Sequence, residues 1–275
     1  MDIVSTIGKT VIHHGDSNKR VYLMSMDTTD THEIIKGLDT LARDKGYTKI
    51  IAKIPEKVIQ SFEMGGYIEE AMIPNLYKGE ENGHFMCRYL DEKRRQDPDH
   101  QRCMQILEDI DTIQATRLKG LGKEYCVSRM SEKHVDDMVL VYREVFKSYP
   151  FPIHDRAYLL RSMKNNLLYY GIWHKDKLVA LASIELAKKY SNAELTDFAT
   201  ISTYRGKGLA THLLKKMEIV LHELNIYTAY TIARAKSFGM NAVFSKQGYT
   251  YGGMLINNTD IAGEIESMNI WYKSL

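Results

Sequence analysis

Arg205-Gly206-Lys207-Gly208-Leu209-Ala210 is the stretch that decides how this 275-residue chain folds. It follows a strand-like run at residues 194–200 and precedes residues 211–224, whose apolar positions recur at helical spacing. Two glycines between a strand and a helix leave backbone N–H groups uncovered at the positive end of the helix. The stretch therefore predicts a site for a pyrophosphate.

Three classes of phosphate ligand use such a turn, and residue spacing separates them. A mononucleotide P-loop needs four residues between its first glycine and Gly-Lys-Ser/Thr, which this turn lacks. A dinucleotide fingerprint needs a third glycine where Thr211 stands. Coenzyme A fits, because Arg205, Gly208 and Ala210 form the pattern R-x-x-G-x-A. An ordinary glycine-rich loop is the alternative. The predicted coenzyme contacts are Arg205, Gly206, Lys207, Gly208, Leu209, Ala210 and Thr211.

Composition excludes several classes of protein. A formal net charge of +2 does not indicate nucleic acid binding. A content of 44% hydrophobic and 26% charged residues is ordinary for a globular chain. The basic run at residues 93–95 is balanced by neighbouring acids, which predicts a solvated helix start. Residues 1–20 lack the apolar core of a signal peptide, and no run approaches the ~20 apolar residues of a membrane span. The three cysteines are odd in number and lack metal-type spacing, so we expect reduced thiols, a cytoplasmic location and no membrane partner.

The chain divides at one polar, helix-prone connector, residues 91–123. Ile106, Ile110 and Ile113 recur at helical spacing there, which predicts an exposed helix with one docked face, ended by Gly120 and Gly122. From residue 124 the pattern predicts a strand, two helices, a hairpin, the strand and helix around the glycine turn, another strand, a short helix and two final strands.

The order β-αα-βββ-α-β-α-ββ over residues 124–275 resembles the GCN5-related N-acetyltransferase (GNAT) superfamily. The glycine turn carries this resemblance, together with a tail at residues 241–249 that keeps Lys246, Gly248 and Tyr249. The resemblance implies an α/β fold with a mixed central sheet flanked by helices, and acetyl-CoA as co-substrate without a metal. It also implies coenzyme contacts from Asn241 and Phe244, although Phe244 stands where many members have tyrosine.

Residues 1–90 resemble a degenerate copy of the second half. Subtracting 182, as Gly248 and Gly66 require, places Phe244 on Phe62 and Tyr249 on Tyr67. The same offset places the glycine turn on residues 23–28, which contain no glycine. Asp27 and Asp30 would put carboxylates where a pyrophosphate needs positive charge. We therefore predict a non-catalytic GNAT-like domain at 1–90, a helical linker at 91–123 and a catalytic domain at 124–275.

Several segments along the whole chain look like the beta-lysine N-acetyltransferase family: residues 13–15, 20–24, 46–50, 148–152 and 239–241. This resemblance implies acetylation of the side-chain amine of β-lysine to N6-acetyl-β-lysine, a neutral osmolyte of methanogenic archaea and some bacteria. It implies a small-molecule amine as the partner and leaves the oligomeric state open.

Acetyl transfer to an amine needs a group that accepts a proton, and two acids precede the glycine turn. Glu194 and Asp197 are the candidates, and strand alternation places them on opposite faces, so at most one should face the substrate. GNAT members favour the position of Glu194. A cross-strand ion pair with a lysine is the alternative for either. We also expect the strand at Phe198, Ala199 and Thr200 to splay from its neighbour, so that freed N–H groups hold the thioester carbonyl.

The loop at residues 148–155 joins the first two helices of the second half and contains two prolines. It offers aromatic walls and an anion for an ammonium: Tyr149, Phe151, Asp155 and Tyr158. Core packing is the alternative for these aromatics. A coenzyme A-binding sensor without catalysis, and an acetyltransferase for protein lysines or aminoglycosides, remain as other functions.

Overall fold

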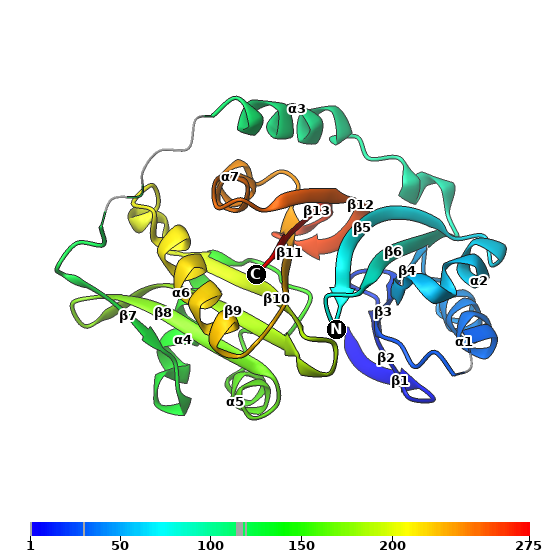
Figure 1. The fold of residues 1–275 in the computed structure, drawn as a ribbon, viewed down its shortest axis with the longest axis horizontal. Helices are drawn as coiled ribbons and strands as arrows, with labels where there is room; N and C mark the ends of the chain where they lie inside the picture. The colour runs from blue at the N-terminus through cyan, green and yellow to red at the C-terminus, as the bar shows by residue number, and fades with distance from the viewer. Residues whose placement is uncertain (1, 30, 114–117, 119) are drawn as a thin grey trace.

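The computed structural model describes residues 2–29, 31–113, 118 and 120–275, and these form one sheet of thirteen strands with helices on both faces (Figure 1). The predicted contribution of Asp30 lies outside the described residues. The strands are β1 (Ile3–Ile7), β2 (Thr10–Gly15), β3 (Arg20–Ser25), β4 (Lys49–Pro55), β5 (Ile68–Tyr77), β6 (Glu81–Tyr89), β7 (Tyr125–Arg129), β8 (Leu167–His174), β9 (Lys177–Ala187), β10 (Asn192–Thr200), β11 (Thr228–Arg234), β12 (Thr250–Ile261) and β13 (Glu264–Ser274). The helices are α1 (Thr31–Asp44), α2 (Ile59–Met64), α3 (His100–Asp111), α4 (Val135–Val145), α5 (Arg156–Lys164), α6 (Leu209–Glu223) and α7 (Phe238–Lys246).

The predicted fold class is confirmed, and the elements expected after residue 124 all form. Helix α6 begins at Leu209, two residues earlier than expected, because Gly208 at φ +74° takes the N-cap position. Earlier in the chain, Ser131 forms a capping box with His134 just ahead of α4. The order of elements is therefore set by local signals that the sequence carries.

The sheet is built as two similar halves placed back to back. Outward from the central pair, the N-terminal half (residues 1–90) runs β5-β6-β4-β3-β2-β1, and the C-terminal half (residues 124–275) runs β12-β13-β11-β10-β9-β8, with β7 at the edge. Helices α1 and α6 occupy the same place in this order, as do α2 and α7, while α4 and α5 have no counterpart among the described residues of the first half. Both halves thus contribute to one continuous sheet.

Strand register repeats with the same offset of 182 residues. Strands β4 and β6 pair Ala52 with Met86, and β11 and β13 pair Arg234 with Met268. The halves meet where Gly253 pairs with Ala71 across β12 and β5. A Cβ on Gly253 would lie 2.3 Å from the carbonyl oxygen of Glu70, so this close approach requires glycine.

The offset fails at the loop that corresponds to the glycine turn. Residues 23–25 belong to β3, so the loop before α1 spans residues 26–30, whereas residues 201–208 separate β10 from α6. The placement of the glycine turn on residues 23–28 was therefore wrong, because the first loop is shorter. Within it, the Asp27 carboxylate accepts a hydrogen bond from the Thr29 N–H (3.0 Å).

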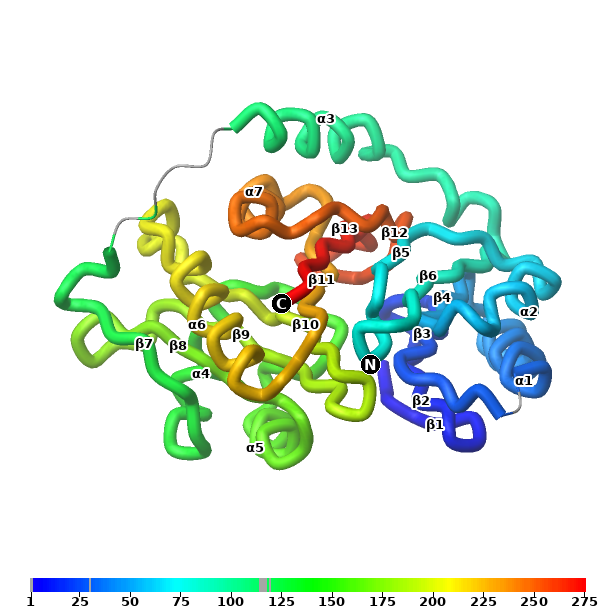
Figure 2. The backbone as a smooth tube through the Cα atoms, viewed as in Figure 1, coloured from blue at the N-terminus to red at the C-terminus, as the bar shows by residue number. Residues whose placement is uncertain are grey.

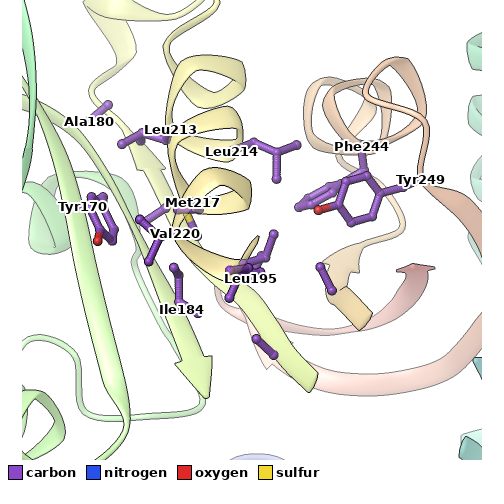
Figure 3. Packing of buried hydrophobic residues seen from close by; sticks show 14 of the residues in the cluster. Tyr170, Ala180, Ile184, Leu195, Leu213, Leu214, Met217, Val220, Phe244 and Tyr249 are labelled. Carbon is purple, nitrogen blue, oxygen red and sulfur yellow. The ribbon is translucent and has the colours of Figure 1, made fainter. Parts of the chain in front are cut away.

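Two apolar layers cover one face of the sheet, and two others cover the opposite face. Helix α6 packs Leu213, Leu214 and Met217 against alternate residues of β9 and β10 (Figure 3). Helix α1 covers the first half in the same way through Ile34 and Leu38. On the opposite face, α4 and α5 cover β8 and β9, and a core shared by both halves lies over the central strands.

The connector at residues 91–123 carries α3, which runs across the outside of the molecule and contacts α7 (Figure 2). The helix ends at Asp111, earlier than Gly120. Ile110 is the most buried of the three predicted contacts, and Cys103 of the same helix is buried in a cluster with Ala235 and Met254. The prediction of a solvated basic run was wrong for Arg94. This side chain is 8% exposed and donates to the carbonyls of Asn257 (2.7 Å) and Asn18 (2.8 Å) and to Thr48 Oγ1 (3.0 Å), which together satisfy its desolvated guanidinium.

Candidate active site

A cavity of about 1230 Å³ reaches from the α4–α5 loop on one face of the sheet to the start of α6 and to α7 on the other face, and both halves line it. The first half contributes residues of β3 and β4, among them Arg20, Tyr22 and Lys53. The second half contributes the glycine turn, β9, β10, β11 and the α4–α5 loop. A site built only from residues 124–275 would therefore be open on one side.

The predicted splay of β10 from β11 is confirmed. Their parallel pairing covers Asn192 to Glu194 and stops at Glu194 opposite Tyr230, while β11 continues to pair with β13 as far as Arg234. Beyond Glu194, the edge of β10 that faces β11 is outside this ladder. Backbone N–H groups at such an opening suit the carbonyl of a thioester, because they need no reorganisation as charge develops on its oxygen.

A β-bulge brings both candidate carboxylates into the same cavity, which corrects the prediction that they face opposite ways. The register between β10 and β9 shifts between Thr196 and Ala199, and Asp197 takes a left-handed conformation at φ +56°. The extra residue turns the Asp197 side chain onto the face that Glu194 occupies. There its carboxylate accepts hydrogen bonds from Tyr149 Oη (2.5 Å) and Ser183 Oγ (2.5 Å).

Three carboxylates gather around this point. Glu185 pairs with Glu194 across β9 and β10, and it lines the cavity with Glu194 and Asp197. Burial raises the pKa of all three groups, and the charge of Glu185 raises that of Glu194 further, to about 7. Lys53 opposes this shift, and its Nζ donates to the hydroxyl of Tyr230 (2.7 Å), the residue paired with Glu194 across β10 and β11. Three acids facing one lysine favour the entry of a cation.

The glycine turn has the open backbone that a pyrophosphate needs. Gly206 and Gly208 both have left-handed φ values, +76° and +74°. A Cβ on Gly206 would meet nothing within 4 Å, and a Cβ on Gly208 would meet only the Leu118 side chain at 3.2 Å. Gly208 caps α6 without a side chain, so the first N–H groups of the helix remain for a ligand. These residues fit coenzyme A.

Most of the predicted coenzyme residues line the cavity: Phe198, Thr200, Arg205, Gly206, Gly208, Leu209, Ala210, Thr211 and Phe244. Lys207 instead points to Tyr125, whose hydroxyl lies 3.3 Å from its Nζ. The Ala199 side chain packs into the core beneath α4. Phe244 is buried edge-on against Phe198 and offers no hydroxyl to the site.

Two predicted site residues have structural partners instead. Asn241 is fully buried: its amide donates to the carbonyls of Arg234 and Ser237, and its oxygen accepts from Asn269 and Trp271. It clamps α7 to β13 and lies outside the cavity lining, so the structure does not bring it together with the other predicted coenzyme residues. Asp155 also lies outside the cavity lining, and its carboxylate caps α5 by accepting from the Ala157 N–H (2.9 Å).

The α4–α5 loop crosses the cavity and contacts the first half. Tyr149, Phe151 and Tyr158 line the cavity as predicted. Phe151 packs against His13 of β2, with ring centroids 4.6 Å apart. Ser148 Oγ accepts from the Gly263 N–H (2.8 Å), which holds the loop against the β12–β13 turn.

Sequence reasoning missed Glu185, Lys53, Tyr22 and Arg20. Glu185 could have been found by aligning the hairpin partner of Glu194. The other three lie in the first half, where the lack of a glycine turn pointed away from any part in the site. Their approach depends on the curvature of the whole sheet, for which the sequence carries no local signal.

The strand order, glycine turn and splayed strands define an acyltransferase of the GNAT class, and the acetyltransferase (GNAT) family matches residues 136–249. The beta-lysine N(6)-acetyltransferase of Methanococcus maripaludis is 34% identical over 273 residues, which cover 99% of both chains. N-acetyltransferase YodP of Bacillus subtilis is 35% identical over 274 residues, covering 96% of each chain. The beta-lysine N(6)-acetyltransferase of Methanosarcina mazei is 31% identical over 266 residues, covering 88% of this chain and 97% of its own. This chain belongs to the GNAT acetyltransferases and, within them, to the beta-lysine N(6)-acetyltransferase family, as its resemblance predicted.

Proposed function

We propose that this enzyme transfers the acetyl group of acetyl-CoA to the side-chain amine of β-lysine, giving N6-acetyl-β-lysine. One observation carries the proposal: Glu194 lies among three cavity carboxylates at the point where β10 leaves β11. An ammonium drawn to these acids would meet a thioester held at the opening. Relatives named for this reaction that cover nearly the whole chain supply the identity of the acceptor.

The chemistry begins with an ammonium group, whose pKa near 10.4 leaves only about one molecule in a thousand unprotonated at neutral pH. Glu194, directly or through water, accepts one proton from it. The nitrogen then attacks the thioester carbonyl carbon, a C–N bond forms, and the carbonyl electrons move to oxygen. N–H groups of β10 beyond Leu195 stabilise that oxyanion.

Collapse of the tetrahedral intermediate breaks the C–S bond, and the sulfur leaves with the electron pair. The nitrogen loses its second proton to solvent, and Glu194 then releases the first proton to solvent as well. A thiol pKa near 8.5 makes this leaving group a good one, so the phenylalanine at position 244 does not prevent the reaction. Coenzyme A is then protonated by solvent. Asp197 holds Tyr149 in the cavity wall and adds to the negative potential that draws in the amine.

As part of the same proposal, residues 1–90 form a non-catalytic GNAT-like domain, residues 91–123 a connector and residues 124–275 the catalytic domain. The mirrored strand order and the repeated register support a duplicated origin. The loop before α1 has no glycine, and its Asp27 would repel a pyrophosphate.

We further propose that the product is a compatible solute made in the cytoplasm for osmoadaptation, because acetylation of one amine leaves β-lysine with no net charge. Within the part of the chain that the structure describes, every helix is too short or too polar to cross a membrane. Deleting the gene should prevent accumulation of the acetylated amino acid at high salt, as judged by NMR of cell extracts. Unchanged accumulation would contradict this role.

The reaction itself is tested by the release of free thiol from acetyl-CoA with β-lysine, α-lysine and a lysine-containing peptide as acceptors. We expect the highest kcat/KM with β-lysine and acetylation of its side-chain amine, as read by NMR of the product. Equal turnover of all three acceptors, or of the peptide alone, would contradict the proposed acceptor. The absence of thiol release with every amine would favour a coenzyme A-binding sensor.

A further inference from the structure

Arg20 is a buried cation with no carboxylate at ion-pair distance among the described residues. It opens β3 and is only 3% exposed. Its Nη1 donates to the carbonyl of Asn258 and to Thr259 Oγ1 (2.9 Å), while its Nε has no hydrogen-bond partner. A desolvated guanidinium normally has a paired acid, so Arg20 needs an explanation that its own fold does not supply.

Asp2 is the carboxylate whose charge acts on Arg20, but hydrogen bonds within the fold already use both of its oxygens. One Asp2 oxygen accepts from the Ser17 N–H (2.9 Å) and the other from the backbone and side chain of Asn18. Burial lowers the pKa of Arg20, but only to about 10, so its charge persists at neutral pH. The positive charge therefore stands without an ion-pair partner beside the cavity that Arg20 lines.

An unpaired acceptor lies next to this donor. Asn258 is 2% exposed and lines the cavity, and its Nδ2 donates to Thr259 Oγ1 (3.3 Å) while its Oδ1 has no partner. Buried polar atoms without partners are uncommon, and a cation beside a free amide oxygen forms a built receptor. The guanidinium of Arg20 suits a carboxylate, and the free amide oxygen of Asn258 suits an ammonium close to that carboxylate.

We infer that Arg20 and Asn258 bind the head group of the acceptor, Arg20 its carboxylate and Asn258 Oδ1 the neighbouring ammonium. This inference rests on the proposed function, because it assigns the end of the acceptor opposite to the amine that Glu194 deprotonates. Tyr22 lies between the two ends. Its ring centroid is 5.4 Å from Arg20 Cζ, and Glu194 exerts a direct electrostatic influence on its hydroxyl.

The arrangement gives the first half a role in specificity. A free diamino acid presents a carboxylate to Arg20 and an amine to Glu194 at once, whereas a lysine inside a peptide has no free carboxylate to offer. Both Arg20 and Tyr22 come from β3, two residues apart on one face of the strand. The half without a coenzyme site thus selects the acceptor.

Two acceptors that differ only in the carboxylate test the assignment: β-lysine and the diamine that remains when its carboxylate is removed. The variants are Arg20→Gln and, as the matched control, Arg94→Gln. Arg94 is also buried, but three acceptors inside the fold satisfy it and it does not line the cavity. Wild-type kcat/KM should favour β-lysine by about 10²-fold or more, as expected when a buried charge loses its partner.

Arg20→Gln should remove most of that preference while leaving turnover of the diamine close to that of the wild type. Arg94→Gln should lower the melting temperature and keep the preference. The wild type should bind β-lysine more tightly than the same acid without its β-amine. Asn258→Leu should lose most of this difference in affinity.

The outcomes separate this inference from the proposed function. If Arg20→Gln lowers kcat/KM equally for both acceptors, Arg20 is structural and the assignment is overturned. Turnover of β-lysine by the wild type would still support the proposed function. If the wild type rejects β-lysine but shows the same Arg20-dependent preference for another amino acid over its diamine, the proposed acceptor fails and the receptor stands. Wild-type turnover of the diamine at least equal to that of β-lysine would overturn the assignment of Arg20.

Discussion

Replacing Glu194 by glutamine tests the proposed general base, because the change removes a charge and a proton acceptor while it keeps the size of the side chain. Glutamine cannot deprotonate the acceptor, so the variant depends on the small fraction of amine that is already free. That fraction grows roughly 300-fold between pH 7 and pH 9.5 for a group of pKa near 10.4. General-base catalysis is typically worth about 10²- to 10⁴-fold. We expect a loss of kcat/KM in this range at pH 7 that becomes much smaller by pH 9.5, by about 100-fold where the loss at pH 7 is large enough.

Wild-type kcat/KM should itself rise as the pH passes about 7, because Glu194 must lose its proton in the free enzyme before it can act as a base. The same raised pKa predicts a gain in stability for Glu194→Gln. Above pH 4.5, its ordinary pKa, Glu194 ionises in the unfolded chain, but in the folded protein it keeps its proton up to about pH 7. The free energy of unfolding therefore falls as the pH rises from 4.5 to about 7. The full effect above pH 7 is about 3 kcal/mol at most, at 1.36 kcal/mol per unit of pKa, and it vanishes below pH 4.5.

The assay combines pH profiles of kcat/KM with urea unfolding at pH 8 and pH 4.5. Glu185→Gln is the matched control: removing its charge should lower the pKa of Glu194, so the rise in activity should move to lower pH and not disappear. An equal loss for Glu194→Gln at pH 7 and pH 9.5, together with lower stability at pH 8, would show that Glu194 is structural. Attention would then move to Asp197.

Three further experiments test the coenzyme site and the role of the first half. Gly208→Glu should abolish acetyl-CoA binding in calorimetry, whereas Gly208→Ala, which shares the left-handed strain at φ +74° but adds no charge, should retain part of it; unchanged affinity for Gly208→Glu would contradict the coenzyme site. Deleting residues 1–90 should give an insoluble or inactive remainder, because Tyr22 and Ile51 belong to the core that both halves share; a soluble, fully active fragment would contradict this. A structure of the coenzyme complex should show no contact at Asp27, and a second coenzyme bound there would contradict a degenerate first half.

Local signals in the sequence determined the order of elements and the position of the coenzyme turn. Gly206 and Gly208 between an alternating run and an amphipathic run suffice for a strand, a phosphate-type turn and a helix, because φ/ψ preference and periodicity act over a few residues. The offset of 182 residues, which the sequence shows, also relates the pairing of β4 with β6 to that of β11 with β13 in the structure. These features depend on short-range chemistry or on internal comparison.

Only the tertiary structure decided how the acids and cations meet. Alternation placed Asp197 on the wrong face, because a bulge is a property of the pairing between β9 and β10 and has no signature in β10 alone. Arg94 was expected in solvent, and it is buried because carbonyls from both halves converge on it. Arg20 stands nearly 240 positions before its partner Asn258 in the chain. The curvature of one continuous sheet brings the two together, since the burial and charge of a side chain depend on the elements that surround it and not on its neighbours in sequence.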